Sequence, residues 1–316
     1  MTHDLRSEGP VSVAEWVEVH SESFSPPICN KLMHKEHLSI MFVGGPNTRT
    51  DFHLDESPEF FWQMKGNMKL PIIERGEKKV IEIKEGEVFL LPSRIPHSPQ
   101  RPEANSLGLV IERARVEGKE FDGLRWYTDF EKCDEVLWEK YFYCGDLGRD
   151  LVPVVEEFRA SEAFATGRPT PGSVIADPPL RQDYQTIVPR PFSLNEWLEE
   201  HSGELSKPGA RLSLFGDDHP EQGFKVVVLG AGGYASPAYT RLGLAGAKQA
   251  TDDELSGGSE AFLYVVRGEV EVSGGDVGQK AVSAGECFVL AEGKFSKFRR
   301  SGDCIALLLT SSSSSP

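Results

Sequence analysis

Short runs of apolar residues recur along the chain, separated by turns rich in glycine and proline. In the first half they lie at His37–Val43, Phe60–Met64, Lys79–Ile83, Val88–Leu91 and Leu107–Glu112. In the second half they lie at Lys225–Leu229, Phe262–Val266, Glu269–Val272 and Cys287–Leu290. Many short strands with frequent turns predict a mainly β protein built as a sandwich or small barrel.

Between these two sets of strands, the pattern changes. Apolar residues recur at helical spacing over Glu131–Ala165, which predicts helix there. The stretch Thr166–Asp177 is rich in proline, glycine and threonine, which predicts a linker. The tail Ser311–Pro316 has low complexity, and we expect it to be disordered.

An internal repeat relates the two halves of the chain. The segment Ser12–His20 (SVAEWVEVH) returns as Ser193–His201 (SLNEWLEEH), and each predicts a helix with serine as N-cap and glutamate three residues later. Further along, Glu59 followed by Gly66 has an expected counterpart in Glu260 followed by Gly268, although the two spacings differ by one residue. Two matches in the same order predict a duplicated β unit.

Length and charge narrow the class of protein. The 316 residues provide enough core for two domains. A net charge of −15 disfavours binding to nucleic acid, because such a surface repels phosphate. No apolar run is long enough for a membrane span, and the N-terminus lacks the pattern of a secretory signal. The five scattered cysteines form no CxxC pair, so we expect a cytoplasmic protein without disulfides or a zinc ribbon.

Two segments of the first repeat carry candidate metal ligands. The stretch GPNTRTDFHLDESPEFFWQMKG contains His53 and Glu59, and GEVFLLPSRIPHSPQR contains His97. Two imidazoles and one carboxylate form the ligand set of non-haem Fe(II) sites and leave positions free for substrate and dioxygen. In a strand, Phe61 and Gln63 share the face of Glu59.

Nearby carboxylates offer alternatives to Glu59, namely Asp51, Asp55 and Glu56. We favour Glu59 because it begins an apolar strand, where a carboxylate without a partner is costly. Arginines in the same two segments, Arg49 and Arg101, suit a substrate carboxylate through their forked guanidinium groups. For Arg101, the simplest alternative is a surface charge after a proline turn.

These segments resemble the paired motifs of the cupin superfamily, with Asp51 where many cupins carry another histidine. The segments PPICNKLMHKEHLSIMFVGGPNTRTDFHLDESPEFFWQMKGNM, GEVFLLPSRIPHSPQR, GLVIERAR, DGLRWYTDF and WEKYFYCGDLG are similar to 3-hydroxyanthranilate 3,4-dioxygenases. The similarity is dense over about residues 24–160. The similarity is thinner beyond residue 160. Because the chain has no CxxC motif, it resembles the two-cupin, animal and fungal-type form of the family.

The resemblance implies a function and assigns roles to single residues. It implies Fe(II) held by His53, Glu59 and His97, and a small aromatic amino-carboxylate substrate that reacts with O2. Arg49 and Arg101 fall where the family binds the substrate carboxylate. Glu112 falls where the family contacts the ring hydroxyl or amine of the substrate. Its alternative is an exposed strand end, because Arg113 and Arg115 follow closely. Asn30 falls at a position that lines the same pocket in the family. The expected reaction opens the ring of 3-hydroxyanthranilate between C3 and C4. Its product, 2-amino-3-carboxymuconate semialdehyde, is the precursor of quinolinate in NAD synthesis from tryptophan.

The expected architecture is a mainly β chain with two jelly-roll cupin domains. We expect a catalytic cupin over residues 1–125, a helical and linker region over 126–180, and a second cupin over 181–310. The second cupin is expected to be metal-free, because no histidine lies near Glu260 and Ser296 stands where His97 would fall. The family's two-cupin form also implies a monomer.

Two other functions remain open on the residues alone. Another metal cupin, such as an isomerase or a dioxygenase of different specificity, would share the three ligands without needing Arg49, Arg101 and Glu112 together. A non-catalytic binding or storage bicupin would suit the degenerate second half. The run Gly230–Gly233 lacks the third glycine of a dinucleotide-binding fingerprint, so we exclude that reading.

Overall fold

The computed structural model describes residues 9–26, 29–232, 253–255, 260–274, 278–292 and 296–311. The chain divides into two compact units that interleave along the sequence. Unit I comprises Glu22–Leu32 and Ser39–Ser193, and unit II comprises Met1–Ser21, Met33–Leu38 and Leu194–Pro316. The expected domain boundaries, near residues 125 and 180, were drawn from the sequence repeat and differ from the boundaries of these two units. The expected boundaries remain a proposal.

Unit I is built on a six-stranded sheet with the order β12-β8-β5-β9-β3-β2. Its strands are β2 (Asn30–Lys35), β3 (Leu38–Gly44), β5 (Glu59–Lys65), β8 (Glu87–Leu91), β9 (Leu107–Arg113) and β12 (Phe192–Ser193). Along β5 the side chains alternate between faces, so Glu59, Phe61 and Gln63 share one face, and all three are buried. The expected inward face of β5 is therefore confirmed.

A second layer faces this sheet and closes the core of unit I. It contains β4 (Phe52–Leu54), β6 (Met68–Glu74), β7 (Glu77–Ile83), β10 (Asp122–Tyr127) and β11 (Val136–Phe142). Single bridges from His97 join β4 to β6 in this layer. The core between the layers includes Phe61 and Phe89 from one side and Leu70 and Ile72 from the other. Burial of these apolar faces is the main force that holds the two layers together.

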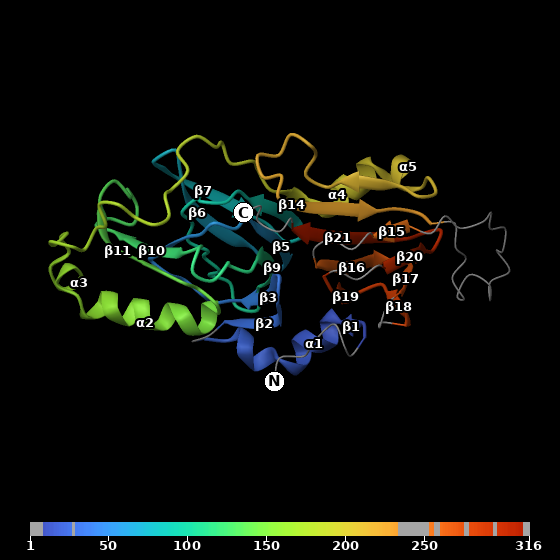
Figure 1. Ribbon diagram of the computed structural model, residues 1–316, viewed down its shortest axis with the longest axis horizontal. Coiled ribbons are helices and arrows are strands. Elements are labelled where there is room, and N and C mark those ends of the chain that lie inside the picture. Colours follow the sequence, from blue (N-terminus) through green and yellow to red (C-terminus); the bar gives the residue numbers. More distant parts are fainter. Residues whose placement is uncertain are drawn as a thin grey trace. The chain divides into compact units, whose positions relative to one another are not determined.

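Beyond β10 and β11 the chain forms the helices α2 (Leu147–Ala160) and α3 (Glu162–Thr166) (Figure 1). Asp146 caps α2 by accepting a hydrogen bond from the amide of Arg149, and Phe158 stacks on Trp126 of β10 with ring centroids 4.0 Å apart. The predicted helix over Glu131–Ala165 is correct only for its second half. Residues Val136–Phe142 form a strand instead, because antiparallel pairing with β10 competes with the local helical pattern.

Unit II repeats the two-layer design. One sheet has the order β1-β19-β16-β21-β14-β13, and the other has the order β15-β20-β17-β18. The first contains β1 (Val11–Ser12), β13 (Arg211–Ser213), β14 (Phe224–Leu229), β16 (Ala261–Arg267), β19 (Glu286–Leu290) and β21 (Ile305–Ser311). The second contains β15 (Asp253–Leu255), β17 (Glu269–Ser273), β18 (Gln279–Ser283) and β20 (Ser296–Arg300). Leu263 and Phe288 from one sheet pack against Val272 and Phe298 from the other.

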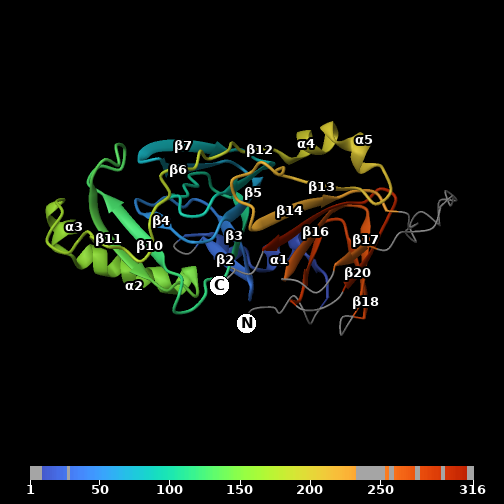
Figure 2. The same cartoon turned by 45° about the horizontal axis from the view of Figure 1, so that its top comes forward.

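The repeated helices are present in both copies. They are α1 (Val13–Val19) and α4 (Leu194–Glu200), while a 3-10 helix (Ser21–Phe24) follows α1 and α5 (Ser202–Leu205) follows α4. Ser12 caps α1 by accepting a hydrogen bond from the amide of Glu15, as predicted. The strand before each helix joins the edge of a barrel in an equivalent way, since Ser12 pairs with Glu286 and Ser193 pairs with Glu87. Figure 2 shows α4 and α5 beside β13 and β14 of unit II.

The prediction of a mainly β chain with two β-rich units is confirmed. All nine runs expected to be strands overlap strands of the structure. Residues 167–191 contain neither helix nor strand, and a linker over Thr166–Asp177 remains a prediction. The predicted disordered tail lies outside the described residues apart from Ser311, which ends β21. No helix in the described part of the chain is long and apolar enough to cross a membrane.

Candidate metal centre

Backbone pairing brings the three predicted metal ligands together at one end of unit I. His53 lies in the middle of β4, and Glu59 is the first residue of β5. His97 follows β8, and its backbone exchanges hydrogen bonds of 2.8 and 2.9 Å with the backbone of His53. Strand pairing rather than side-chain attraction thus sets where the two imidazoles lie.

The side chains of these residues converge in the buried interior. His97 Nε2 lies 3.0 Å from Glu59 Oε1, and His53 Nδ1 lies 3.7 Å from the same oxygen. Asp55 adds a second carboxylate, whose Oδ2 is 3.5 Å from His53 Nδ1. One donor atom from each of these four residues lies within 4.8 Å of all the others. The spacing suits a single metal ion, and all four residues are buried.

Neighbouring groups fix which nitrogen of each imidazole is free. His97 Nδ1 lies 2.9 Å from the carbonyl oxygen of Ile95, and a carbonyl can only accept, so Nδ1 carries the proton. His53 Nε2 lies 2.7 Å from Asp122 Oδ2, which likewise places its proton on Nε2. His97 Nε2 and His53 Nδ1 are therefore the nitrogens that face Glu59. When protonated they donate hydrogen bonds to its carboxylate, and with a metal ion bound they would offer it their lone pairs, as metal-binding histidines do.

Asp122 and Arg115 were not among the predicted site residues. Arg115 donates to both oxygens of Asp122, with Nε 2.7 Å from Oδ1 and Nη2 2.9 Å from Oδ2. Asp122 is fully buried, and burial alone would raise the pKa of its carboxyl. The Arg115 charge and the hydrogen bond from His53 outweigh burial and lower that pKa. A sequence signal did exist, since Asp122, like Glu59, is a carboxylate at the first position of a strand and is followed directly by uncharged residues.

Carboxylates outnumber guanidinium groups in the buried surroundings of the cluster. Four buried carboxylates, Asp55, Glu59, Glu112 and Asp122, face the two buried guanidinium groups of Arg101 and Arg115. Burial, followed by repulsion from Glu59 among other charges, raises the pKa of both Asp55 and Glu112. For Glu59, burial also opposes ionisation, but attraction to His97 and hydrogen bonds from His53 and His97 hold its pKa well below the usual range.

A divalent cation fits this chemistry. Two oriented imidazoles and a carboxylate supply the donors, and the surplus of buried carboxylates supplies the compensating charge. Asp55 Oδ2 is buried and makes no hydrogen bond to the described residues. Metal binding by His53, Glu59 and His97 thus agrees with the donor set, although their role as ligands stays a prediction.

Arg101 is the least satisfied charge in unit I. Only 2% of its surface is exposed, and its Nε and Nη2 make no hydrogen bond within the described part of the chain. Desolvation lowers the pKa of its guanidinium to about 10. The absence of a side chain at Gly108 leaves room for it, since a methyl group there would lie 3.1 Å from Arg101 Nη2. An ionised, buried and unpaired guanidinium is costly unless an anion joins it.

The other predicted residues occupy different surroundings. Glu112 is not an exposed strand end, because it is buried and pairs across the sheet with Glu59. Arg49 is half-buried and forms an ion pair with Asp51. Asn30 begins β2, with its Oδ1 3.8 Å from the position of a methyl group at Gly148 in α2. The substrate-binding roles of these residues remain predictions.

The strand registers correct the repeat alignment. Glu59 pairs with Leu91 at the end of β8, whereas Ala261 pairs with Leu290 at the end of β19. Glu59 and Ala261 each precede a left-handed glycine by seven residues, Gly66 (φ 66°) and Gly268 (φ 74°). The expected counterpart Glu260 is therefore wrong, and the equivalent residue is Ala261. A slip of one residue also reverses the face of the strand.

The same register assigns the other ligand positions of the second copy. Leu255 pairs with Ser296 in the second copy, just as His53 pairs with His97 in the first. Leu255 also lies six residues before Ala261, and His53 lies six residues before Glu59. Leu255 and Ser296 therefore stand at the positions of His53 and His97. None of these three residue types offers an imidazole or a carboxylate.

Glu260 serves a different purpose in unit II. Its Oε1 lies 3.0 Å from His34 Nε2, and its Oε2 accepts a hydrogen bond of 2.8 Å from the amide of Leu38. The residue at the position of Arg101 is also arginine, Arg300, and its Nη1 donates to the carbonyl oxygens of Ala210 and Gly230. Both charged side chains bind backbone or side-chain groups of their own unit.

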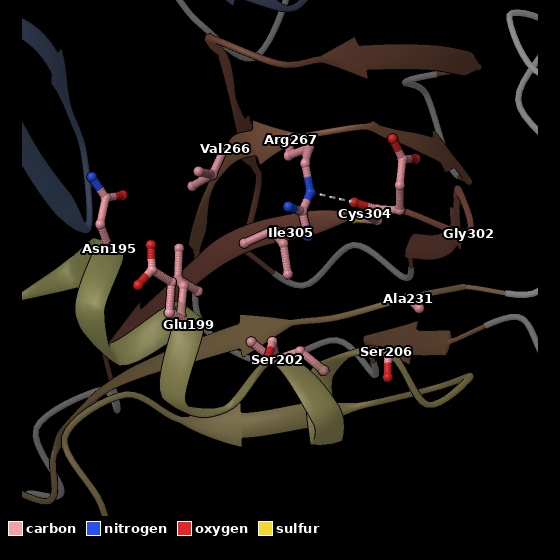
Figure 3. A pocket seen from close by; sticks show the side chains of 13 residues that line it. Asn195, Glu199, Ser202, Ser206, Ala231, Val266, Arg267, Gly302, Cys304 and Ile305 are labelled. Carbon is pink, nitrogen blue, oxygen red and sulfur yellow. Dashed lines mark hydrogen bonds between the residues drawn. The ribbon is translucent and has the colours of Figure 1, made fainter.

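Unit II contains a cavity of its own (Figure 3). It measures about 460 Å³ and lies between α4, α5 and the ends of β16 and β21, with Glu199, Arg267 and Ile305 among its lining residues. Arg267 Nε donates a hydrogen bond of 3.1 Å to the carbonyl oxygen of Asp303. None of the metal-cluster residues lines this cavity, so it is a separate feature of the chain.

Comparison with known proteins identifies relatives of this chain. A family model described as 3-hydroxyanthranilic acid dioxygenase matches residues 5–159. The 3-hydroxyanthranilate 3,4-dioxygenase of Rattus norvegicus is 49% identical over 227 residues, or 72% of this chain and 76% of the rat protein. The Homo sapiens protein of that name is 47% identical over 225 residues, or 71% and 76% of the two chains.

One relative extends over nearly the whole sequence. The Danio rerio 3-hydroxyanthranilate 3,4-dioxygenase is 39% identical over 300 residues, which cover 94% of this chain and 93% of the fish protein. Among solved structures, a Cupin 2 conserved barrel domain protein from Leptotrichia buccalis covers 99% of this chain and 100% of its own, with 10% identity and a TM-score of 0.46.

Proposed function

The chain belongs to the 3-hydroxyanthranilate 3,4-dioxygenase family, and we propose that it opens the ring of 3-hydroxyanthranilate between C3 and C4. The reaction consumes O2 and incorporates both oxygen atoms to give 2-amino-3-carboxymuconate semialdehyde. This product cyclises to quinolinate, which leads to NAD. The observation that carries the proposal is the buried cluster of His53, Glu59 and His97 in a chain with such relatives.

His53 Nδ1, His97 Nε2 and a carboxylate oxygen of Glu59 would hold the metal ion. When bound, Fe(II) would supply the redox centre at which the substrate and O2 meet. The two imidazole lone pairs are held ready, because Asp122 and the carbonyl of Ile95 accept the opposite N–H groups. Burial excludes water from the cluster and strengthens every interaction between charges inside it.

Arg101 would bind the substrate carboxylate. Its Nε and Nη2 make no hydrogen bond to the described residues, and they form one edge of the guanidinium group. Two parallel N–H donors on one edge match the two oxygens of a carboxylate. Arg49 would provide a second positive charge on the face of β4, where Asp51 holds it in place. Asn30 would line the same pocket. These contacts would orient the ring with its hydroxyl and amine toward the metal ligands.

Glu112 would accept the proton from the substrate hydroxyl. It lies directly across the sheet from Glu59, and burial raises the pKa of its carboxyl. A raised pKa strengthens a carboxylate as a base and brings it closer to the range in which proton transfer is efficient. Arg115 Nη1 lies 3.0 Å from Glu112 Oε2, and its positive charge opposes that shift. The charge thereby favours the ionised carboxylate, which is the form that can accept a proton.

The test combines metal loading with turnover. We would load the protein with Fe(II) under anaerobic conditions, measure iron per chain, then add oxygenated 3-hydroxyanthranilate and follow the semialdehyde by absorbance. We expect one iron per chain and turnover in the wild type, and neither in His97→Ala. Glu199→Ala, in the cavity of unit II, is the matched control and should behave as wild type.

The outcome also separates the alternatives. Iron binding without turnover of 3-hydroxyanthranilate would reject the assignment in favour of a non-catalytic or differently specific metal-binding bicupin. We further propose that the second copy binds no metal and that the protein is a cytoplasmic monomer. Sedimentation of the iron-loaded chain as a dimer would contradict the last of these proposals.

A further inference from the structure

Arg115 contacts three of the four buried carboxylates in the cluster. Beyond its forked pair with Asp122, its Nη1 lies 3.0 Å from Glu112 Oε2 and its Nη2 lies 3.3 Å from Asp55 Oδ2. The side chain is buried, and Nη1 also donates to the carbonyl of Arg113. One guanidinium group thus links the carboxylate behind a metal-ligand histidine to the carboxylate of the expected base.

The first arm of this link reaches His53. Asp122 Oδ2 accepts from both Arg115 Nη2, at 2.9 Å, and His53 Nε2, at 2.7 Å. The forked contact fixes the plane of the Asp122 carboxylate, and the carboxylate fixes the plane of the imidazole. Without Arg115, Asp122 would be free to rotate, and its hold on the orientation of His53 would weaken.

The second arm reaches Glu112. Glu112 and Glu59 are directly opposite on β9 and β5, where like charges repel. Arg115 is the cation closest to Glu112 among the ion pairs of the described residues. Its attraction offsets the repulsion between the two carboxylates and holds Glu112 Oε2 at the guanidinium group. Removing it would let Glu112 reorient within the cluster.

We propose that Arg115 is a positioning residue that couples the two tasks of the site, orienting His53 through Asp122 and placing Glu112 directly. The proposal rests on the proposed function for the role of Glu112, whereas the His53 arm depends only on metal binding. Loss of Arg115 should therefore weaken metal binding and also impair turnover at saturating metal. Loss of the Asp122 charge should weaken metal binding and leave most of the turnover intact.

Arg113 offers a matched control two residues away. It is buried to the same extent, and its Nη1 and Nη2 form a forked pair with Glu120 at 2.8 and 2.7 Å. Its side chain does not pair with Asp55, Glu112 or Asp122. A general loss of stability from breaking a buried arginine pair would affect Arg113→Met and Arg115→Met alike.

The experiment measures Co(II) affinity by competition with a chelator, and kcat and KM at saturating Fe(II). Arg115→Met and Asp122→Asn should each bind Co(II) about 10- to 100-fold more weakly than wild type. Only Arg115→Met should also lose kcat at saturating iron. Arg115→Lys should recover part of both losses, and Arg113→Met should match wild type in both readouts.

Two outcomes would overturn the proposal: wild-type Co(II) affinity in Arg115→Met, or equal losses in Arg113→Met. If Arg115→Met does not fold, Arg115→Lys and Asp122→Asn carry the test, and unchanged Co(II) affinity in both would overturn it. A wild type that binds Co(II) yet does not turn over 3-hydroxyanthranilate would reject the proposed function and leave the His53 arm to be decided by affinity.

Discussion

Replacing Arg101 with methionine should make the protein more stable and a poorer enzyme. Methionine keeps the apolar stem of the side chain while removing the guanidinium group. Arg101 is almost completely buried, and two of its nitrogens make no hydrogen bond to the described residues. Without substrate, this charge is a cost of folding, and with substrate it becomes the partner of a carboxylate.

The magnitudes follow from these two states. Removing unsatisfied buried donors should raise the free energy of unfolding by about 1–3 kcal/mol. Removing two charge-assisted hydrogen bonds to a buried carboxylate should cost about 3–5 kcal/mol of binding. That cost corresponds to a loss of roughly 150- to 5,000-fold in kcat/KM. Arg113→Met serves as the control, because it removes a paired arginine and should lower stability without a loss of substrate affinity.

The assay compares two substrates on both proteins. 2-Aminophenol is 3-hydroxyanthranilate without the carboxylate. The wild type should therefore have a much higher kcat/KM for 3-hydroxyanthranilate than for 2-aminophenol. In Arg101→Met the preference should nearly vanish, since the variant has lost the group that recognises the carboxylate. If the variant discriminates between the substrates as strongly as wild type does, or unfolds at lower urea concentration, the assignment of Arg101 is wrong.

Three further predictions, the first with a control variant, probe other parts of the structure. Gly108→Ala should raise KM, because the added methyl would lie 2.8 Å from Gln63 Oε1 and 3.1 Å from Arg101 Nη2 and so would displace both side chains. Gly203→Ala meets no atom within 4 Å and should leave KM unchanged. Ala261→Glu should lower the free energy of unfolding by at least about 2 kcal/mol, because it places a carboxylate in an apolar core. An unchanged midpoint of urea denaturation would contradict the strand register that we assign to the second copy. Ser12→Ala should lower the stability of unit II by about 0.5–1 kcal/mol through loss of the α1 cap, with no change in metal affinity.

Strands and repeated helices could be predicted because their signals are local. Short apolar runs bounded by turns, as in β5 and β9, and the serine cap of α1 need no knowledge of distant contacts. The stretch Val136–Phe142 could not be assigned in this way. Its apolar residues fit a helical period over so short a run, and only pairing with β10 makes it a strand.

The candidate site was predicted in part, for a related reason. Two imidazoles and a carboxylate that begins an apolar strand marked His53, His97 and Glu59 along the sequence. Asp122 lies far from them in sequence and joins His53 only when β10 pairs with β4. The error at Glu260 has a similar origin, since a shift of one residue is small in an alignment but decides which face of a strand a side chain occupies.

Metal-dependent ring opening is tested most directly by the ratio of O2 consumed to 3-hydroxyanthranilate consumed in the iron-loaded protein. The expected ratio is one to one, with semialdehyde formed in the same amount, and His53→Ala should show no uptake. Oxygen uptake without loss of the aromatic substrate, or substrate loss that persists in His53→Ala, would contradict the assignment of this cluster as the reaction centre.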